Sequence, residues 1–470
     1  MPRSSLKTQW SIIAPLLLGL ALRIWFVAHA GRVDGDGLLY GDIARNWLQH
    51  SIYGFSADFG LPHPTLIRLP GYPLFLAICF RLFGVEHYTA VMAVQILADL
   101  FTCTLIAALA NRLFGHRAAL AALWLAALCP FTAVYTASIL SETLTLLTIA
   151  LAFYSLERWR NTVLETGLAL NRWLWFIGPA LAYALLLRPE QALLAAAILP
   201  AMAWIAWQNR PEPPSQLAIL LTLICIVLPL VPWTARNWRT FHVFQPIAPR
   251  YANDPGEHIP RGFFRWYRTW AIDFASTETI YWNYNGQPVQ IADLPTRAFD
   301  SNAEYARTAT LFDAYNRTTT SNPTLDAAFN QLATERIHAN PIRYYLALPA
   351  ARLINMALRP RTENLPLPLE WWKLHEYRGQ SVEAFTLAAI NLMYLVLAAY
   401  GLWLWRQAGW NGNPALAAAM VAAILLRCAL LLTIDNSEPR YTLEFYPGLI
   451  VLAARAFIHH KNVTPPTPSS

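Results

Sequence analysis

The apolar residues of this 470-residue chain come in long blocks, and this pattern restricts its possible folds more than any other feature. Hydrophobic residues make up 56% of the chain and charged residues 13%, which is about half the charged share of a typical soluble domain. A block of about 20 largely apolar residues can cross a bilayer as one helix. The sequence therefore predicts an all-α polytopic membrane protein that does not fold in water.

Ten blocks are long and apolar enough to be interpreted as membrane spans. We expect helices near 10–29, 91–113, 118–138, 142–158, 172–187, 191–208, 215–235, 384–405, 413–434 and 442–459. Basic residues gather in the short loops on the N-terminal side, so the positive-inside rule places both chain ends in the cytoplasm. The Pro- and Ser-rich segment after Lys461 is expected to be a short disordered cytoplasmic tail.

The first apolar block has some features of a secretory signal peptide. Arg3 and Lys7 precede it, and Ala28-His29-Ala30 resembles a signal-peptidase site. Because the block opens a membrane protein, and because Arg23 interrupts it near its outer end, we expect it to be retained as the first span. The five cysteines lie singly in apolar stretches, so we interpret them as small hydrophobic residues.

Two further apolar segments are interpreted as helices lying in the outer membrane interface. Residues 71–84 are too short to cross the bilayer untilted, and residues 341–358 contain Arg343 and Arg352. If either segment crossed, the topology after it would be inverted.

With both segments in the interface, the chain divides into three parts. Residues 1–235 form an N-terminal transmembrane module whose first outer loop is 30–90. Residues 236–383 form an extracytoplasmic region that includes the second interfacial helix and is expected to fold as a small mixed domain with a modest core. Residues 384–470 form the C-terminal transmembrane helices and the tail.

The first outer loop places acidic residues directly after a membrane helix, in Val33-Asp34-Gly35-Asp36-Gly37. The glycines allow a tight bend, and an amphipathic helix is expected from Leu38, with Asp36 at its start where the helix dipole favours a carboxylate. Taken alone, this pattern is explained by a helix cap with solvated acids. A carboxylate at the membrane surface can also accept a proton from a hydroxyl group near a lipid headgroup.

Five other motifs fall on the same outer face in this topology, although they are scattered along the chain. They are Arg68-Leu69-Pro70-Gly71-Tyr72-Pro73, Ser141-Glu142, Arg188-Pro189-Glu190, Pro232-Trp233-Thr234-Ala235-Arg236-Asn237 and Glu438-Pro439-Arg440-Tyr441. Each alone is explained by a helix cap or by an interfacial side chain. Together they suit transfer of a sugar from a lipid-linked phosphate, because arginines stabilise the anionic leaving group and a carboxylate activates the acceptor.

These motifs resemble those of the GT-C glycosyltransferases, which include the protein O-mannosyltransferases and the aminoarabinose transferase that modifies lipid A. The matching elements run in order from residue 30 to 460: D-x-x-x-Y-x-x-I-A at Asp36, Tyr40, Ile43 and Ala44, then R-x-P-G-Y-P, Leu140-Ser141-Glu142, Leu187-Arg188-Pro189, P-W-T-x-R-N and E-x-R-Y. The resemblance implies a membrane glycosyltransferase that uses a polyprenyl-phosphate-linked sugar. It also implies an extracytoplasmic site in the cell (inner or plasma) membrane, with a hydroxyl group of a protein, lipid or glycan as acceptor.

The resemblance also implies roles for individual residues. Asp36 takes the position of the family's proposed base, and Arg68 that of the residue that contacts the lipid phosphate. Where relatives often have Asp-Glu, this chain has Asp36-Gly37, so a second acid must come from Asp34 or Glu142. The full set of candidates is Asp36, Asp34 and Glu142 for catalysis, with Tyr40, Arg68, Tyr72, Arg188, Glu190, Arg236, Asn237, Arg440 and Tyr441 for substrate binding.

A metal is not expected. Asp34-x-Asp36 would fit the D-x-D motif of metal-using oligosaccharyltransferases of the same fold, but Mg²⁺ or Mn²⁺ needs more oxygen ligands than one pair supplies. Nucleic acid is not expected as a partner, because the net charge of +7 comes without a basic cluster.

Two other functions remain as alternatives. A transporter or flippase of a lipid-linked or small polar substrate should place its charges near the bilayer midplane and show internal repeats, and an O-antigen-type polymerase or ligase would share the lipid donor. Inside the predicted spans, Asp99 and Gln95 are expected to form hydrogen bonds between helices, and Arg427 is expected to pair with Glu444.

Overall fold

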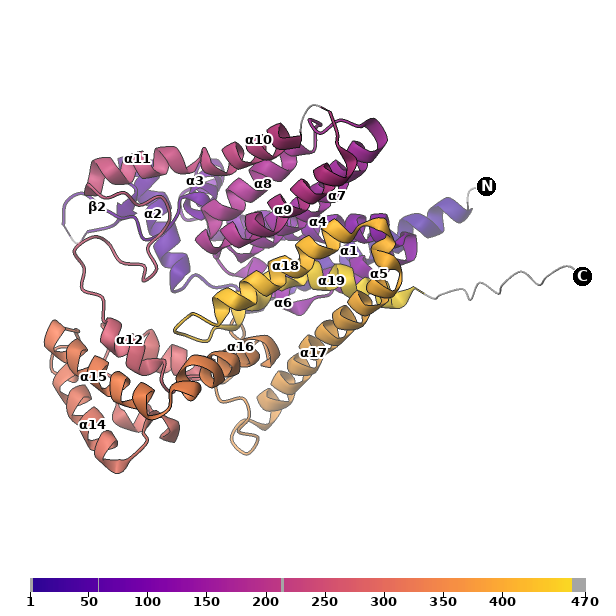
Figure 1. The fold of residues 1–470 in the computed structure, drawn as a ribbon. Helices are drawn as coiled ribbons and strands as arrows, with labels where there is room; N and C mark the ends of the chain where they lie inside the picture. The colour runs from indigo at the N-terminus through magenta and orange to yellow at the C-terminus, as the bar shows by residue number, and fades with distance from the viewer. Residues whose placement is uncertain (1–2, 58, 213–214, 459–470) are drawn as a thin grey trace, which may run out of the picture.

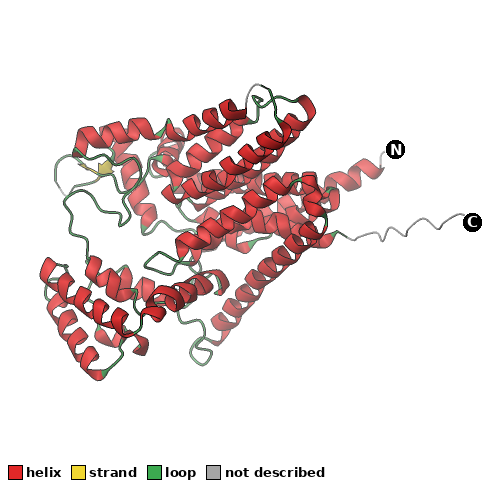
Figure 2. Cartoon of the chain, in the orientation of Figure 1, coloured by secondary structure: helices red, strands yellow, loops and turns green. Residues whose placement is uncertain are grey.

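The fold was analysed in a computed structural model that describes residues 3–57, 59–212 and 215–458. Most of it is helical, as Figure 2 shows, and the expected all-α, multi-pass membrane protein is confirmed. The predicted tail after Lys461 lies outside the described residues.

The N-terminal half is a series of long helices broken by short turns. In chain order it contains α1 (Arg3–Ala30), α2 (Asp36–His50), β1 (Gly54–Phe55), β2 (His63–Pro64), α3 (Gly71–Phe83), α4 (Tyr88–Phe114), α5 (His116–Ala127), α6 (Pro130–Ala133), η1 (Val134–Ala137), α7 (Glu142–Thr166), α8 (Leu174–Leu187), η2 (Pro189–Gln191), α9 (Ala192–Asn209), α10 (Ser215–Val227) and α11 (Leu230–Phe241). Strands β1 and β2 form a small antiparallel pair in the first loop.

The rest of the chain forms a helical lobe and then returns to the bundle. The lobe contains α12 (Arg261–Tyr267), α13 (Phe274–Ser276), η3 (Thr277–Tyr281), η4 (Ile291–Asp293), η5 (Thr296–Ala298), α14 (Asn302–Asn316), α15 (Pro323–Ala339), η6 (Arg343–Ala347) and α16 (Leu348–Leu358). The returning segment contains α17 (Arg378–Gln407), η7 (Gly409–Gly412), α18 (Pro414–Leu431), η8 (Pro439–Phe445), α19 (Tyr446–Ala454) and η9 (Arg455–Phe457).

Among the described helices, six are long and apolar enough to cross a membrane, and the bent pair of α5 with α6–η1, which turns by 50°, would be a seventh. The six are Trp10–Ala30, Tyr88–Phe114, Pro189–Asn209, Gln216–Phe241, Arg378–Gln407 and Pro414–Leu431. The other expected spans are also helical, in α7, α8 and η8–α19, but they are shorter or more polar. The count of ten crossings therefore stays a prediction.

The elements of the first outer loop and the lobe lie at the same end of the helix bundle, and α1 begins at the opposite end (Figure 1). This arrangement agrees with the expectation that 30–90 and 236–383 share one side of the membrane. The expectation of a mixed domain was wrong: residues 236–383 are described throughout and contain helices but no strand. Aromatic residues form the lobe's modest core, including Phe263, Trp266 and Phe329.

Polar side chains inside the bundle join helices, as expected. The Arg23 guanidinium donates from Nε to Asp99 Oδ2 at 2.7 Å, linking α1 to α4, and from Nη1 to the Ala127 carbonyl of α5 at 2.8 Å. Gln95 accepts a hydrogen bond from the Tyr72 hydroxyl at 2.8 Å. Because every partner is buried, these contacts satisfy groups that would be costly to leave unpaired in a membrane.

Both segments expected to lie in the interface are helical. In α3, Tyr72, Leu76 and Phe80 are buried against the bundle. In η6 and α16, Arg352 is fully buried and donates to the Ala271 carbonyl at 3.1 Å. The opposite face of this helical segment exposes an apolar stripe, made of Ile342, Leu346, Ile354 and Leu358. The location of segments 71–84 and 341–358 in the membrane interface stays a prediction.

Candidate active site

Asp36 lies between two arginines from distant parts of the chain. It is the first residue of α2, and the preceding Gly35, at φ 45°, makes the bend that the sequence suggested. Arg68 Nη2 donates to Asp36 Oδ1 at 2.7 Å, and Arg440 Nη2 donates to Asp36 Oδ2 at 3.0 Å. Burial alone would raise the pKa of Asp36, but the charges of Arg440 and then Arg68 outweigh burial and hold that pKa well below its usual range.

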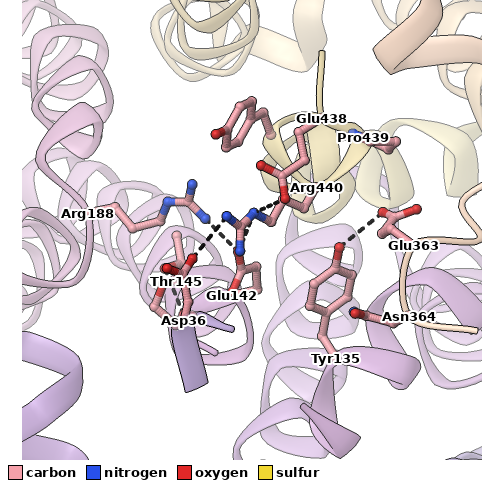
Figure 3. Close-up of polar contacts among 12 residues, drawn as sticks. Asp36, Tyr135, Glu142, Thr145, Arg188, Glu363, Asn364, Glu438, Pro439 and Arg440 are labelled. Carbon is pink, nitrogen blue, oxygen red and sulfur yellow. Dashed lines mark hydrogen bonds and ion pairs between the residues drawn. The ribbon is translucent and has the colours of Figure 1, made fainter. Parts of the chain in front are cut away.

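Arg440 also connects Asp36 to a second carboxylate. Glu142 begins α7 and is buried. Its Oε1 accepts from Arg188 Nη1 at 2.7 Å and lies 3.9 Å from Arg440 Nε. Arg188 follows α8 in an extended conformation. The close-up in Figure 3 shows Arg188, Glu142, Asp36 and Arg440 together. Three predicted motifs and the first loop therefore meet in one cluster.

Glu438 is the acid that the sequence analysis left out of the candidate set. It pairs with Arg440 and is almost completely buried. Burial raises the pKa of Glu438 to about 7, and the charge of Arg440 opposes part of that rise. A signal for it was present in the Glu438-Pro439-Arg440 motif. The backbone of Glu438 is extended. The side chains of Glu438 and Arg440, two positions apart, can therefore lie on the same side.

A second set of ion pairs extends the cluster into the bundle. Arg188 Nε lies 2.8 Å from Glu190 Oε1 and 3.4 Å from Glu444 Oε1. Arg427 lies 3.0 Å from Glu444 and 3.4 Å from Glu190, so the expected pairing of Arg427 with Glu444 is confirmed. Glu190, proposed as a substrate ligand, here balances the charge of Arg188 and Arg427.

The aromatic candidates separate into two groups. The ring centres of Tyr40 and Tyr72 are 5.0 Å apart in an edge-on contact, and the Arg68 guanidinium lies 5.9 Å from the centre of the Tyr40 ring. Arg188 and Arg440 each lie 5.8 Å from the centre of the Tyr441 ring. Tyr72 is fully buried and its hydroxyl is used by Gln95. The structure therefore gives Tyr72 a packing role and does not support the expected contact with substrate.

Three other candidates do not contact this cluster. Arg236 donates to the carbonyls of Thr65 and Tyr53, both at 2.7 Å. Its guanidinium therefore holds the first loop against α11. Asn237 donates to the Gln245 carbonyl at 2.8 Å. Asp34 pairs with Arg32 at 3.1 Å, and 61% of its side chain is exposed. The second acid of the cluster is therefore not Asp34. Of the four arginines among the substrate-binding candidates, Arg68, Arg188 and Arg440 converge and Arg236 does not.

The geometry does not gather the ligands of a metal. Asp34 and Asp36 hold different arginines. Within the part of the chain that the structure describes, no three His, Cys, Asp or Glu side chains come together as a metal site requires. Metal independence itself stays a prediction.

Comparison with known proteins gives one family match and several similar solved structures. Residues 62–233 match the family described as dolichyl-phosphate-mannose-protein mannosyltransferase. No curated protein sequence matches the chain. Among solved structures, the Archaeoglobus fulgidus oligosaccharyltransferase tethered with an acceptor peptide is 12% identical, with a TM-score of 0.49 over 95% of this chain and 49% of that chain. This chain thus spans about half the length of that enzyme.

The ArnT protein of Cupriavidus metallidurans is also similar, in its apo state and bound to undecaprenyl phosphate. The two structures are 16% and 15% identical, with TM-scores of 0.38 and 0.37, over 96% of this chain and 78% of that chain. The family match covers Arg68, Glu142 and Arg188, three residues of the cluster. Over residues 62–233, therefore, this chain is similar to the dolichyl-phosphate-mannose-protein mannosyltransferases, and the resemblance to this family that its motifs predicted is confirmed.

Proposed function

We propose that this protein transfers a sugar from a polyprenyl-phosphate donor to a hydroxyl acceptor, with inversion at the anomeric carbon. The observation that carries the proposal is the Arg68–Asp36–Arg440 arrangement, in which two guanidinium groups flank one carboxylate. Guanidinium groups suit the leaving phosphate and a carboxylate suits the incoming hydroxyl group. The family match over 62–233 supports the same donor class.

Arg68 and Arg440 are the proposed phosphate ligands. Each directs one terminal nitrogen at Asp36, and a guanidinium has five N–H donors. A phosphate bound between them would take part of their charge away from Asp36. Because those charges hold the pKa of Asp36 down, phosphate binding would raise that pKa and make the carboxylate a better base. The base would thus become effective when the donor is in place.

The chemical step then needs no covalent intermediate. The acceptor oxygen attacks the anomeric carbon on the face opposite the phosphate. A carbon–oxygen bond forms as the bond to the phosphate oxygen breaks, and polyprenyl phosphate leaves with its negative charge held by Arg68 and Arg440. Asp36 takes the proton of the acceptor hydroxyl. Arg188 and Glu142 hold Arg440 in position from the other side.

The proposed location is the extracytoplasmic face of the cell membrane, with a protein, lipid or glycan hydroxyl as acceptor. The distribution of basic residues over the loops supports this side. So does the position of the first-loop elements at the same end of the bundle as the large lobe (Figure 1). The lipid tail of the donor would remain in the bilayer.

The test is release of polyprenyl phosphate from a labelled sugar lipid by the purified full-length chain in nanodiscs, with cell-envelope extract as acceptor. Turnover that needs both acceptor and Asp36 would support the proposal. A transporter or flippase would instead move the intact sugar lipid between leaflets of proteoliposomes without cleaving it. Movement without cleavage would contradict a transferase.

A further inference from the structure

A second polar group, outside the mechanism above, lies on the side of Arg440 away from Arg188 (Figure 3). It consists of Tyr135 from η1, with Glu363 and Asn364 from the segment between α16 and α17. Arg361 of the same segment donates to the Pro439 carbonyl at 2.8 Å, so this segment is attached to the turn that carries Arg440.

The amide of Asn364 has a fixed orientation. Arg32 Nη2 donates to Asn364 Oδ1 at 2.9 Å and to the Glu363 carbonyl at 2.7 Å. Because a guanidinium can only donate hydrogen bonds, the amide oxygen must face Arg32. Asn364 Nδ2 then points away from Arg32. The residue is only 6% exposed, and Nδ2 is buried without a hydrogen-bond partner.

The carboxylate of the neighbouring Glu363 has one oxygen in a hydrogen bond and one without a partner. Tyr135 donates its hydroxyl hydrogen to Glu363 Oε1 at 3.0 Å. Glu363 Oε2 is buried and accepts no hydrogen bond. Consecutive residues therefore offer one free donor and one free acceptor. Buried polar atoms without partners are rare and costly, and a bound ligand is one explanation of them.

A sugar hydroxyl group is complementary to this pair, since it accepts one hydrogen bond and donates another. We propose that Glu363 and Asn364, held by Tyr135 and Arg32, form a subsite that binds a hydroxyl group of the sugar carried by the donor lipid. This inference rests on the proposed function and specifies which side chains recognise the transferred sugar. The unpartnered Oε2 atoms of Glu142 and Glu438, in the adjoining cluster, would be further acceptors for the same ring.

The test uses two isosteric substitutions. Asn364→Asp keeps an oxygen for Arg32 and replaces the free donor with an acceptor. Glu363→Gln keeps an oxygen for Tyr135 and replaces the free acceptor with a donor. Each single variant leaves the sugar hydroxyl with one mismatched partner. The double variant exchanges donor and acceptor, so a rotated hydroxyl group can again satisfy both.

Binding is measured with the full-length chain in nanodiscs and no acceptor present. The probes are polyprenyl phosphate alone and polyprenyl phosphate carrying mannose, glucose or galactose, in separate titrations. For the sugar lipid that wild type binds best, we expect each single variant to lose about tenfold or more in affinity. The double variant should recover most of that loss, while affinity for the bare lipid stays within about twofold of wild type. Asn302→Asp, at an exposed position of α14, is the matched charge control.

Equal losses for bare and sugar-bearing lipids, or no loss in either, would overturn the subsite. An unchanged sugar-lipid affinity with a raised KM for a glycan acceptor would overturn it as well, by assigning the pair to the acceptor sugar. Thermal unfolding of each variant in detergent separates these results from misfolding, and recovery of sugar-lipid affinity at an unchanged melting temperature cannot come from restored stability alone. Failure of the wild-type chain to bind any of these lipids would instead overturn the proposed function.

Discussion

Arg440 Nη2 donates a hydrogen bond to Asp36 Oδ2 at 3.0 Å, across 404 positions of sequence. This contact joins the first residue of α2 to η8, the short helix that precedes α19. The same guanidinium pairs with Glu438 and approaches Glu142. Arg440 is thus the residue through which the motifs of the first loop, α7 and the C-terminal turn meet. Substituting Arg440 is therefore the most direct test of the site.

Arg440→Lys should weaken donor binding. Lysine keeps the charge but cannot hold Asp36, Glu438 and a phosphate with a planar fork of donors. We expect the KM for the polyprenyl-linked sugar to rise about tenfold to a hundredfold, because a charged hydrogen bond is lost. Arg236→Lys is the matched control. Since Arg236 donates to backbone carbonyls of the first loop, its variant should lower thermal stability and leave the KM of the surviving folded protein near wild type. The reverse result would show that Arg236 binds the donor.

Asp36→Asn should abolish turnover while donor binding persists. Asparagine keeps the size and the acceptor oxygen but cannot take a proton, so the rate should fall about 10²–10⁴-fold. Asp34→Asn is the control, because the Asp34 side chain is largely exposed and forms an ion pair with Arg32, outside the cluster. Its variant should keep most activity in the same assay of polyprenyl phosphate release. Wild-type turnover in Asp36→Asn would remove Asp36 from the mechanism.

Activity should not depend on an added divalent metal. Asp34 and Asp36 hold different arginines instead of sharing a ligand sphere. We expect turnover by the purified chain to survive exhaustive treatment with EDTA at constant ionic strength. Loss of activity that Mg²⁺ or Mn²⁺ restores would contradict this expectation, and Asp34→Asn should then be about as damaging as Asp36→Asn.

The part of the fold that could be predicted from the sequence is the part that depends on local residue patterns. Long apolar blocks predicted helices, and the glycines around Asp36 predicted a bend at the start of α2. The order of the motifs predicted which segments would meet, since Asp36, Arg68, Glu142, Arg188 and Arg440 do lie in one connected cluster. The sequence predicted that Asp99 would bond to another helix, but it did not predict Arg23 as the partner. Nothing local to either residue specifies the facing helix.

Other features depend on packing that a single sequence does not display. Tyr72 and Arg236 lie in the expected motifs, but tertiary contacts direct their polar atoms to Gln95 and to backbone carbonyls. Glu363 and Asn364 carried no recognisable pattern. Their free atoms are defined only by Arg32 and Tyr135, which come from distant segments.

The predicted topology has the first loop and the lobe on the extracytoplasmic side of the membrane. In a cysteine-free background, we expect Ser56→Cys and Ala303→Cys, both at exposed positions, to react in intact cells with a membrane-impermeant thiol reagent. Any outer membrane must first be made permeable. Gln208→Cys, near the end of α9, is the control and should react only after lysis. Labelling at Gln208→Cys with protection of the other two would invert the orientation.

Stability should fall as the pH rises through neutrality, because of Glu438. Burial raises the pKa of Glu438 to about 7, above its usual value of 4.5. A carboxyl group whose pKa is raised by folding stabilises the protein in its protonated form. That contribution is complete below the usual pKa and is lost as the pH passes through about 7. Asp36 acts in the opposite direction: its lowered pKa contributes stability above its usual range, and that stability is lost only in acid. Between about pH 6 and pH 8, therefore, only Glu438 of these two should make the stability depend on pH.

We expect the melting temperature of the full-length chain in detergent to decrease over this interval. Glu438→Gln, which imitates the protonated form, should remove that part of the decrease, and Glu165→Gln, at an exposed position near the end of α7, should leave it unchanged. A slope that is identical in wild type and Glu438→Gln would show that Glu438 does not titrate near neutrality and would contradict this prediction.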